Sequence, residues 1–127
     1  MHAIKLLLVE DSSVLAERIA ELVRGIPEID LIAVVDSESA ALLEMKKRRV
    51  HMVVLDLHLK QGTGFGILRA MNNIQPKPRV IVHTNHYSAD YENNALLLGA
   101  DIFLDKARDF ERLPEILKTI VKPDDMR

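Results

Sequence analysis

Short apolar runs alternate with longer segments of mixed character along most of the chain. The runs with the length of strands are residues 4–9, 29–35, 51–56, 79–84 and 101–104. Three of them are apolar at nearly every position and do not alternate with polar residues. Such runs are typical of parallel strands that are covered by helices on both faces. The pattern therefore predicts a buried, mostly parallel sheet.

The segments between these runs repeat apolar residues at spacings of three and four, which is the period of an amphipathic helix. These segments are residues 12–26, 37–49, 64–74, 88–100 and 109–121. Several begin at Ser or Asp, which commonly cap helix N-termini. Pro114 fits the last helix only within its first turn or two, because proline lacks an N–H donor. Five alternating strands and helices predict one α/β domain over residues 1–127, with right-handed crossovers.

Composition narrows the classes of function. The chain has 127 residues, enough for one domain with its own core. It has 17 Lys and Arg against 19 Asp and Glu, so no basic excess favours direct binding to nucleic acid. It has no cysteine, which excludes thiol catalysis and fits a cytoplasmic protein. The start lacks a signal peptide, and no apolar run approaches the roughly 20 residues of a membrane span.

Polar side chains follow the predicted strands at the points where those strands end. Glu10 and Asp11 follow the first strand, Asp56 ends the third, Thr84 ends the fourth, and Lys106 comes just after the fifth. The carboxyl ends of parallel strands meet at one edge of a sheet, where ligands bind. Three carboxylates at one edge repel each other, and a hard divalent cation such as Mg²⁺ relieves that repulsion. A carboxylate nucleophile, a cation, an ammonium and a hydroxyl are sufficient for phosphoryl transfer.

The stretches "LLLVEDSS", "VVLDLHL", "VIVHTN" and "GADIFLDKA" together resemble the receiver domain of bacterial two-component response regulators. The resemblance covers nearly the whole chain and implies the flavodoxin-like receiver fold, with strand order 2-1-3-4-5 and five helices. It also implies a signalling phosphoacceptor, not an enzyme. The implied roles are phosphoacceptor for Asp56, direct Mg²⁺ ligand for Asp11, ligand through water for Glu10, a place in the metal set for His58, switch hydroxyl for Thr84, aromatic switch for Phe103, and phosphate partner for Lys106.

The chain departs from the family pattern at several positions. Ala107 stands where a proline commonly follows the lysine through a cis bond, which leaves the geometry of the 105–108 loop open. Lys60 replaces a common proline, and Phe103 lacks the hydroxyl of the common tyrosine. We expect backbone N–H groups around Leu57, His58 and the 62–64 loop to lie near the bound anion, because glycine there permits close approach.

Other functions compete with this interpretation. A phosphohydrolase with an Asp nucleophile would carry a second acid in a DxDx[TV] motif, whereas residues 56–59 read "DLHL". A nucleotide-binding module is disfavoured because "GTGFG" follows the third strand and no P-loop is present. A receiver-like scaffold without phosphorylation stays possible. A transition-metal site at His58, His83 and His86 is the minor alternative to a packed His83 and two solvent-facing rings.

The resemblance also implies partners. They are a histidine kinase or histidine phosphotransfer protein, a downstream protein, and a second copy of this chain in a phosphorylation-dependent homodimer. About six residues follow the last predicted helix, too few for a linker and an output domain. The sequence therefore predicts either a stand-alone receiver or one domain of a longer regulator, with output through protein contacts.

Overall fold

The five predicted strands form one parallel sheet in the computed structural model, which describes residues 3–120. The strands are β1 (Ile4–Val9), β2 (Ile29–Val35), β3 (Met52–Leu55), β4 (Arg79–Thr84) and β5 (Ile102–Asp105). Their order across the sheet is β2-β1-β3-β4-β5, with every neighbouring pair parallel. The predicted fold class and strand order are confirmed, and the third and fifth strands differ from prediction by one residue at their ends.

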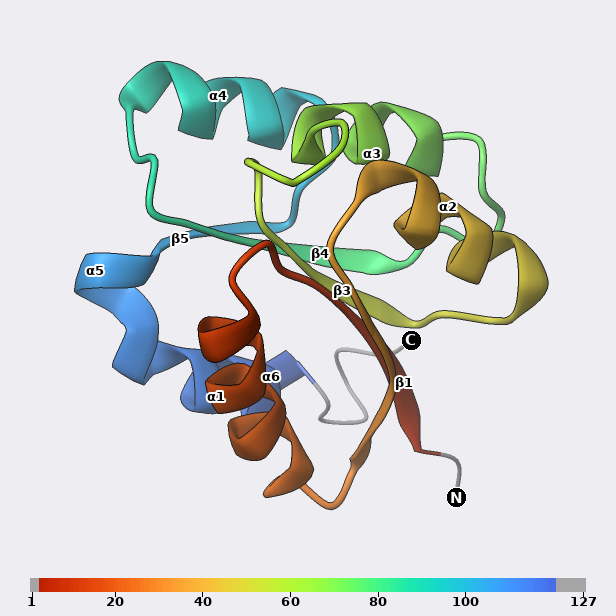
Figure 1. Ribbon diagram of the computed structural model, residues 1–127, viewed down its shortest axis with the longest axis vertical. Coiled ribbons are helices and arrows are strands. Elements are labelled where there is room, and N and C mark those ends of the chain that lie inside the picture. The colour runs from red at the N-terminus through yellow and green to blue at the C-terminus, as the bar shows by residue number, and fades with distance from the viewer. Residues whose placement is uncertain (1–2, 121–127) are drawn as a thin grey trace.

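The helices form a layer on each face of the sheet (Figure 1). One layer holds α2 (Glu38–Lys47), α3 (Gly64–Met71) and α4 (Ala89–Leu97). The other holds α1 (Ser13–Arg24), α5 (Lys106–Asp109) and α6 (Leu113–Ile120), and a 3₁₀ turn at Phe110–Arg112 joins the last two. Within residues 3–120, no helix combines the length and apolar character needed to cross a bilayer.

The fifth helical segment begins earlier than predicted and is divided into α5, the 3₁₀ turn and α6. It begins at Lys106, three residues before the predicted start, because the Asp105 side chain caps it by accepting from the N–H of Ala107 at 2.9 Å. Asp109, the predicted first residue, instead accepts from the N–H of Asp105 at 3.0 Å. Pro114 is the second residue of α6, within its first turn as predicted. The predicted end at residue 121 lies outside the described residues.

Hydroxyl side chains cap the starts of the four other helices; the three serine caps agree with the prediction, whereas Thr63 was not predicted as a cap. Each N-cap oxygen accepts from the N–H three residues on, in the pairs Ser12–Leu15, Ser37–Ala40, Thr63–Gly66 and Ser88–Tyr91. The helices end two or three residues earlier than predicted. After α4, Gly99 has a φ of 111°, which only glycine adopts easily. The helix starts were thus easier to predict than the ends.

Two apolar cores lie on opposite faces of the sheet. Alternate residues of the central strands enter different cores, as Leu7 and Val53 enter one and Leu8 and Val54 enter the other. All four of these side chains are buried. The central strands are therefore apolar throughout because each of their faces is covered.

Gly64 lies where the backbone of α3 approaches the end of β3. A Cβ atom at this position would come within 2.8 Å of the Leu57 Cα and 2.5 Å of the Asp56 carbonyl oxygen. We expect Gly64→Ala to lower the free energy of unfolding by about 1–3 kcal/mol, because backbone atoms must move. Gly25→Ala is the matched control, since φ there is −76° and the nearest atom lies at 3.4 Å. Urea unfolding should leave the Gly25 variant within about 1 kcal/mol of the native chain; equal losses in both variants would contradict the prediction.

Candidate functional site

The carboxyl ends of β1, β3 and β4 and the start of α5 bring the predicted polar residues to one edge of the sheet. Glu10 directly follows β1, Asp56 follows β3, and Lys106 is the first residue of α5. Thr84 is the last residue of β4 and is fully buried. Asp11, after Glu10, is partly buried. The sheet topology therefore gathers residues that are far apart in the sequence.

Lys106 forms ion pairs with two buried carboxylates. Its Nζ lies 2.7 Å from Glu10 Oε1 and 2.9 Å from Asp56 Oδ2. The three side chains are at most 6% exposed, so their charges are poorly screened by water. One ammonium facing two carboxylates leaves the cluster with an excess of negative charge. Binding of a cation, or replacement of one of the two carboxylates, would therefore change the electrostatic energy of the cluster strongly.

Glu10 is held by donors on both of its carboxylate oxygens. Oε1 pairs with Lys106, and Oε2 accepts from the N–H of Ser12 at 2.9 Å. Burial raises the pKa of Glu10 above its ordinary value, while Lys106 and the Ser12 N–H oppose that rise. The side chain therefore depends on these two partners to stay ionised.

The two oxygens of Asp56 have different environments. Oδ2 is paired with Lys106, whereas within residues 3–120 the partner of Oδ1 is the N–H of His58, at 3.3 Å. The Oγ1 of Thr84 accepts from the N–H of His86 at 3.1 Å, an arrangement with the same two-residue spacing. Asp56 Oδ1 is thus the oxygen with the weaker partner and the one more available for chemistry.

Asp11 carries an orphaned oxygen. Its Oδ1 is buried and has no hydrogen-bond partner among the described residues. A buried carboxylate oxygen without a donor costs free energy unless a cation or an ordered water satisfies it. Between residues 3 and 120, no group of three or more His, Asp or Glu side chains is already arranged around a common point for a metal. Lys106 holds Glu10 and Asp56 in the arrangement observed.

This donor set fits a hard divalent cation. Mg²⁺ prefers oxygen ligands and keeps several waters, so a few carboxylates are sufficient. Asp11 supplies the orphaned oxygen, and Glu10 and Asp56 supply further carboxylates. His58 was predicted in the metal set, but the only oxygen it offers is its main-chain carbonyl, and an imidazole suits softer ions.

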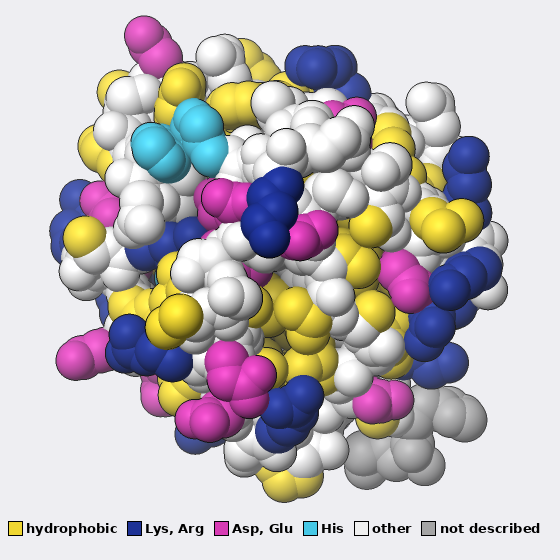
Figure 2. Space-filling view, in the orientation of Figure 1, with side chains coloured by type: hydrophobic (Ala, Val, Ile, Leu, Met, Phe, Trp, Pro, Cys, Tyr) yellow, Lys and Arg dark blue, Asp and Glu magenta, His cyan; other side chains and the backbone are white. Residues whose placement is uncertain are grey.

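Two histidines lie together at the mouth of the site. The rings of His58 and His86 have centroids 3.7 Å apart and are tilted by 37°. Both residues are exposed, whereas His83 is buried, as the sequence predicts. Figure 2 shows two neighbouring histidine side chains on the same face as several acidic side chains. The sequence missed this pairing, although each histidine stands two residues after a predicted site residue.

The glycine-containing loop contacts α2 and not an anion site. The N–H of Thr63 donates to Glu38 Oε1 at 3.0 Å, and that of Gly64 donates to the Leu57 carbonyl at 2.9 Å. Gly62, at φ 76°, and Gly66 both lie so close to the Glu38 side chain that a Cβ atom would overlap it. The expectation that the 62–64 loop offers its N–H groups to a phosphate is therefore wrong for Thr63 and Gly64. Glu38 was not predicted, since nothing in its local sequence indicates this contact.

The remaining predicted positions are peripheral to the ion-paired cluster. Phe103 is partly buried, and its ring lies edge-on to Tyr87 with centroids 6.1 Å apart. In the described part of the chain, the cis peptide bond is Gln75–Pro76, so the Lys106–Ala107 bond is trans. With alanine in place of the common proline after Lys106, the peptide bond is trans, and the Asp105 side chain caps the helix that begins there.

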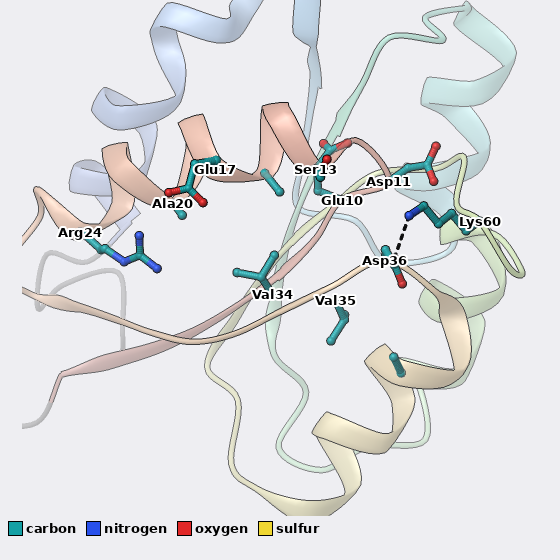
Figure 3. A pocket seen from close by; sticks show the side chains of 12 residues that line it. Glu10, Asp11, Ser13, Glu17, Ala20, Arg24, Val34, Val35, Asp36 and Lys60 are labelled. Atoms are coloured by element: carbon teal, nitrogen blue, oxygen red, sulfur yellow. Dashed lines mark ion pairs between the residues drawn. The ribbon is translucent and has the colours of Figure 1, made fainter.

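A groove of about 420 Å³ runs from the site along α1 and β2 (Figure 3). Asp11 lies at one end, where Lys60 points between it and Asp36 and forms a 3.3 Å ion pair with Asp36. Val34, on β2, faces the middle of the groove and is 46% exposed. The groove combines a charged end with an apolar wall.

Comparison with known families identifies a match over most of the chain. The model of the response regulator receiver domain matches residues 6–118. The transcriptional regulatory protein CitB of Klebsiella pneumoniae is 27% identical over 122 residues, which are 96% of this chain and 52% of that protein. A protein-glutamate methylesterase/protein-glutamine glutaminase of Syntrophus aciditrophicus is 31% identical over 124 residues, 92% of this chain and 35% of that protein. The chain spans about half or less of the length of these relatives.

Solved structures share the fold. The signal receiver domain of a Luxo repressor protein from Vibrio parahaemolyticus is 28% identical, with a TM-score of 0.85 over 94% of this chain and 90% of that one. The manganese-bound form of the response regulator Rcp1 is 22% identical, with a TM-score of 0.76 over 91% of this chain and 90% of that one. The latter likeness concerns the fold alone.

Proposed function

The chain belongs to the response regulator receiver domain family, and from this premise we propose that Asp56 accepts a phosphoryl group from a histidine kinase or histidine phosphotransfer protein. The observation that carries the proposal is the buried cluster in which Lys106 pairs with Asp56 and Glu10. A family member without the reaction would have no need of this charged cluster, because apolar residues of similar volume are often as stabilising.

Attack by Asp56 Oδ1 agrees with its surroundings. Oδ2 is already paired with Lys106, and Oδ1 has the weaker hydrogen bond. As the Oδ1–phosphorus bond forms, the bond from phosphorus to the donor breaks, and the leaving group departs with those electrons. Lys106 would neutralise phosphoryl oxygens, and the Thr84 hydroxyl would donate a hydrogen bond to one of them. In this proposal Phe103 follows the movement of Thr84 as the aromatic switch residue.

Glu10, Asp11 and Asp56 are the side chains that would hold Mg²⁺, with the His58 carbonyl as a further oxygen. The orphaned Asp11 Oδ1 supports this assignment. When bound, Mg²⁺ would neutralise charge on the transferring phosphoryl group.

The output of the chain is a change in protein contacts. We assign to residues 1–127 a single receiver domain of the cytoplasm that signals to a downstream protein, with a homodimer formed on phosphorylation as one form of output. The chain would turn over no external substrate and would bind neither nucleic acid nor membrane directly. The methylesterase named among its relatives is a longer protein, of which this chain covers 35%.

Chemical phosphorylation tests the proposal. Incubation with acetyl phosphate and Mg²⁺ should add one phosphoryl group, and trapping by borohydride reduction followed by peptide mass spectrometry should place it on Asp56. EDTA should abolish the labelling, because three carboxylates at one edge repel the anionic donor unless a cation offsets their charge. Asp36→Asn is the control, since Asp36 is exposed and outside the ion-paired cluster.

Two outcomes would overturn the proposal. Labelling that persists on an Asp56→Asn chain would place the acceptor elsewhere. A native chain that stays unlabelled, although circular dichroism shows it to be folded, would favour the receiver-like scaffold without phosphorylation.

A further inference from the structure

The loop between β3 and α3 is tied to the start of α2 by side-chain hydrogen bonds in both directions. Glu38 Oε1 accepts from the N–H of Thr63 at 3.0 Å, and Gln61 Oε1 accepts from the N–H of Ser39 at 3.0 Å. The two main chains also meet, since the N–H of Glu38 donates to the Gln61 carbonyl at 2.9 Å. The proposed phosphoryl transfer uses neither Glu38 nor Gln61, although the loop that they hold contains Asp56.

Thr63 connects Glu38 to the proposed phosphorylation site. It is paired with His58 as in an antiparallel sheet, and its hydroxyl caps α3 by accepting from the N–H of Gly66 at 3.1 Å. The N–H of His58 in turn donates to Asp56 Oδ1 at 3.3 Å. A continuous chain of contacts therefore runs from Glu38 through Thr63 and His58 to the oxygen that would attack phosphorus.

The far end of this loop has few restraints of its own. Residues 60–63 are exposed, and Gly62 has a φ of 76° and no side chain to pack. Exposed segments with few buried contacts open easily. The partly buried Glu38 side chain lies against Gly62 and binds Thr63, so it restrains the loop at the point where α3 begins.

We infer that Glu38 is a positioning residue for Asp56. By holding Thr63 it fixes His58, whose N–H orients Asp56 Oδ1 and whose carbonyl is the further oxygen proposed for Mg²⁺. Groups that orient a metal ligand commonly change metal affinity or activity by about 10–100-fold when they are removed. The inference rests on the proposed function of Asp56, but its first test needs neither Mg²⁺ nor a phosphodonor.

Amide hydrogen exchange, followed by NMR on the metal-free full chain, tests the positioning directly. Glu38→Ala should speed exchange at the His58 N–H at least about threefold, because the loop loses its restraint and opens more often. The His86 N–H is the internal reference, since it donates to Thr84 Oγ1 with the same two-residue spacing and should keep its native rate. Glu38→Gln retains an acceptor oxygen and should keep the native rate at both amides.

Mg²⁺ affinity, measured by calorimetry, tests the consequence for the site. Glu38→Ala should weaken binding about tenfold, whereas Glu38→Gln should bind nearly as the native chain does. Gln61→Ala is the matched control, because it removes the other side-chain hydrogen bond between the loop and α2 but leaves that of Thr63 with Glu38. It should retain the native affinity, and circular dichroism checks that each variant is folded.

Three outcomes have distinct meanings. Native exchange at the His58 N–H in Glu38→Ala overturns the inference. An equal loss of Mg²⁺ affinity in Glu38→Gln and Glu38→Ala also overturns it, because the cause would then be the charge of Glu38 and not its hydrogen bond. A native chain that binds no Mg²⁺ contradicts the proposed function instead, and the exchange at His58 still decides whether Glu38 positions the loop.

Discussion

Lys106→Met should lower the free energy of unfolding by about 3–5 kcal/mol at pH 7.5, the usual effect of removing one partner from a buried ion pair. The change leaves Glu10 and Asp56 facing each other without the ammonium that lies within 2.9 Å of both. Methionine fills a similar volume, so the loss reports mainly charge. Urea unfolding monitored by circular dichroism measures it.

The pH dependence of this loss identifies its cause. Without Lys106, burial and the nearby charge of Asp56 raise the folded-state pKa of Glu10 further above its unfolded value. Such groups contribute full stability below the unfolded pKa, and the contribution falls as pH rises through the folded one. The stability that the Lys106 variant has lost relative to the native chain should therefore become smaller as pH falls from 7.5 to 5.

Two further variants serve as controls. Adding Glu10→Gln to the Lys106 variant should recover part of the lost stability, whereas Lys118→Met, at an exposed position, should change stability little. A deficit that is constant with pH would show lost packing instead.

His83 should make the native chain sensitive to mild acid. Both ring nitrogens are buried and have no partner among the described residues, and the ring lies 5.8 Å from that of Phe110. Burial, assisted by the charge of Lys106, lowers the pKa of His83 from 6.5 to about 4. Between these two values the unfolded chain binds the extra proton, so stability is full above pH 6.5 and is lost as pH falls toward 4. The total loss is about 3 kcal/mol, since one pKa unit is worth about 1.4 kcal/mol.

His83→Leu should remove this sensitivity. At pH 5 the variant should be more stable than the native chain by about 2 kcal/mol beyond any difference at pH 7.5. His86→Gln is the matched control, because His86 is exposed and should leave the pH dependence unchanged. Parallel stability curves for the native chain and the His83 variant from pH 7.5 to 4.5 would contradict the assignment.

Local pattern was sufficient to predict the sheet and the position of the charged residues. Fully apolar runs indicated buried parallel strands, and the sheet then placed Asp56, Glu10 and Lys106 at one edge without further information. The strand order followed from family resemblance. The start of the last helical segment was not predictable from periodicity, because it depends on two side-chain acceptors. Asp105 accepts from the N–H of Ala107, and Asp109 accepts from the N–H of Asp105.

Long-range side-chain partners were beyond sequence reasoning. The contact of Glu38 with the 62–66 loop joins positions about 25 residues apart, and no repeat or motif marks it. The stacking of His58 on His86 depends on two loops meeting in space. The sequence indicated that His83 would be packed, but not that both of its nitrogens would lack partners.

The contact between Glu38 and the glycine loop also restricts how this sequence can vary. A Cβ atom at position 66 would lie 2.5 Å from Glu38 Oε1, so a larger residue there displaces the Glu38 carboxylate from its hydrogen bond with the Thr63 N–H. Position 62 keeps its glycine even then, because its φ of 76° disfavours other residues. The effects of substitutions at positions 38 and 66 should therefore be coupled, because the two residues share this contact. Glu38 thus joins the start of α2 to the start of α3, which are about 25 residues apart in the sequence.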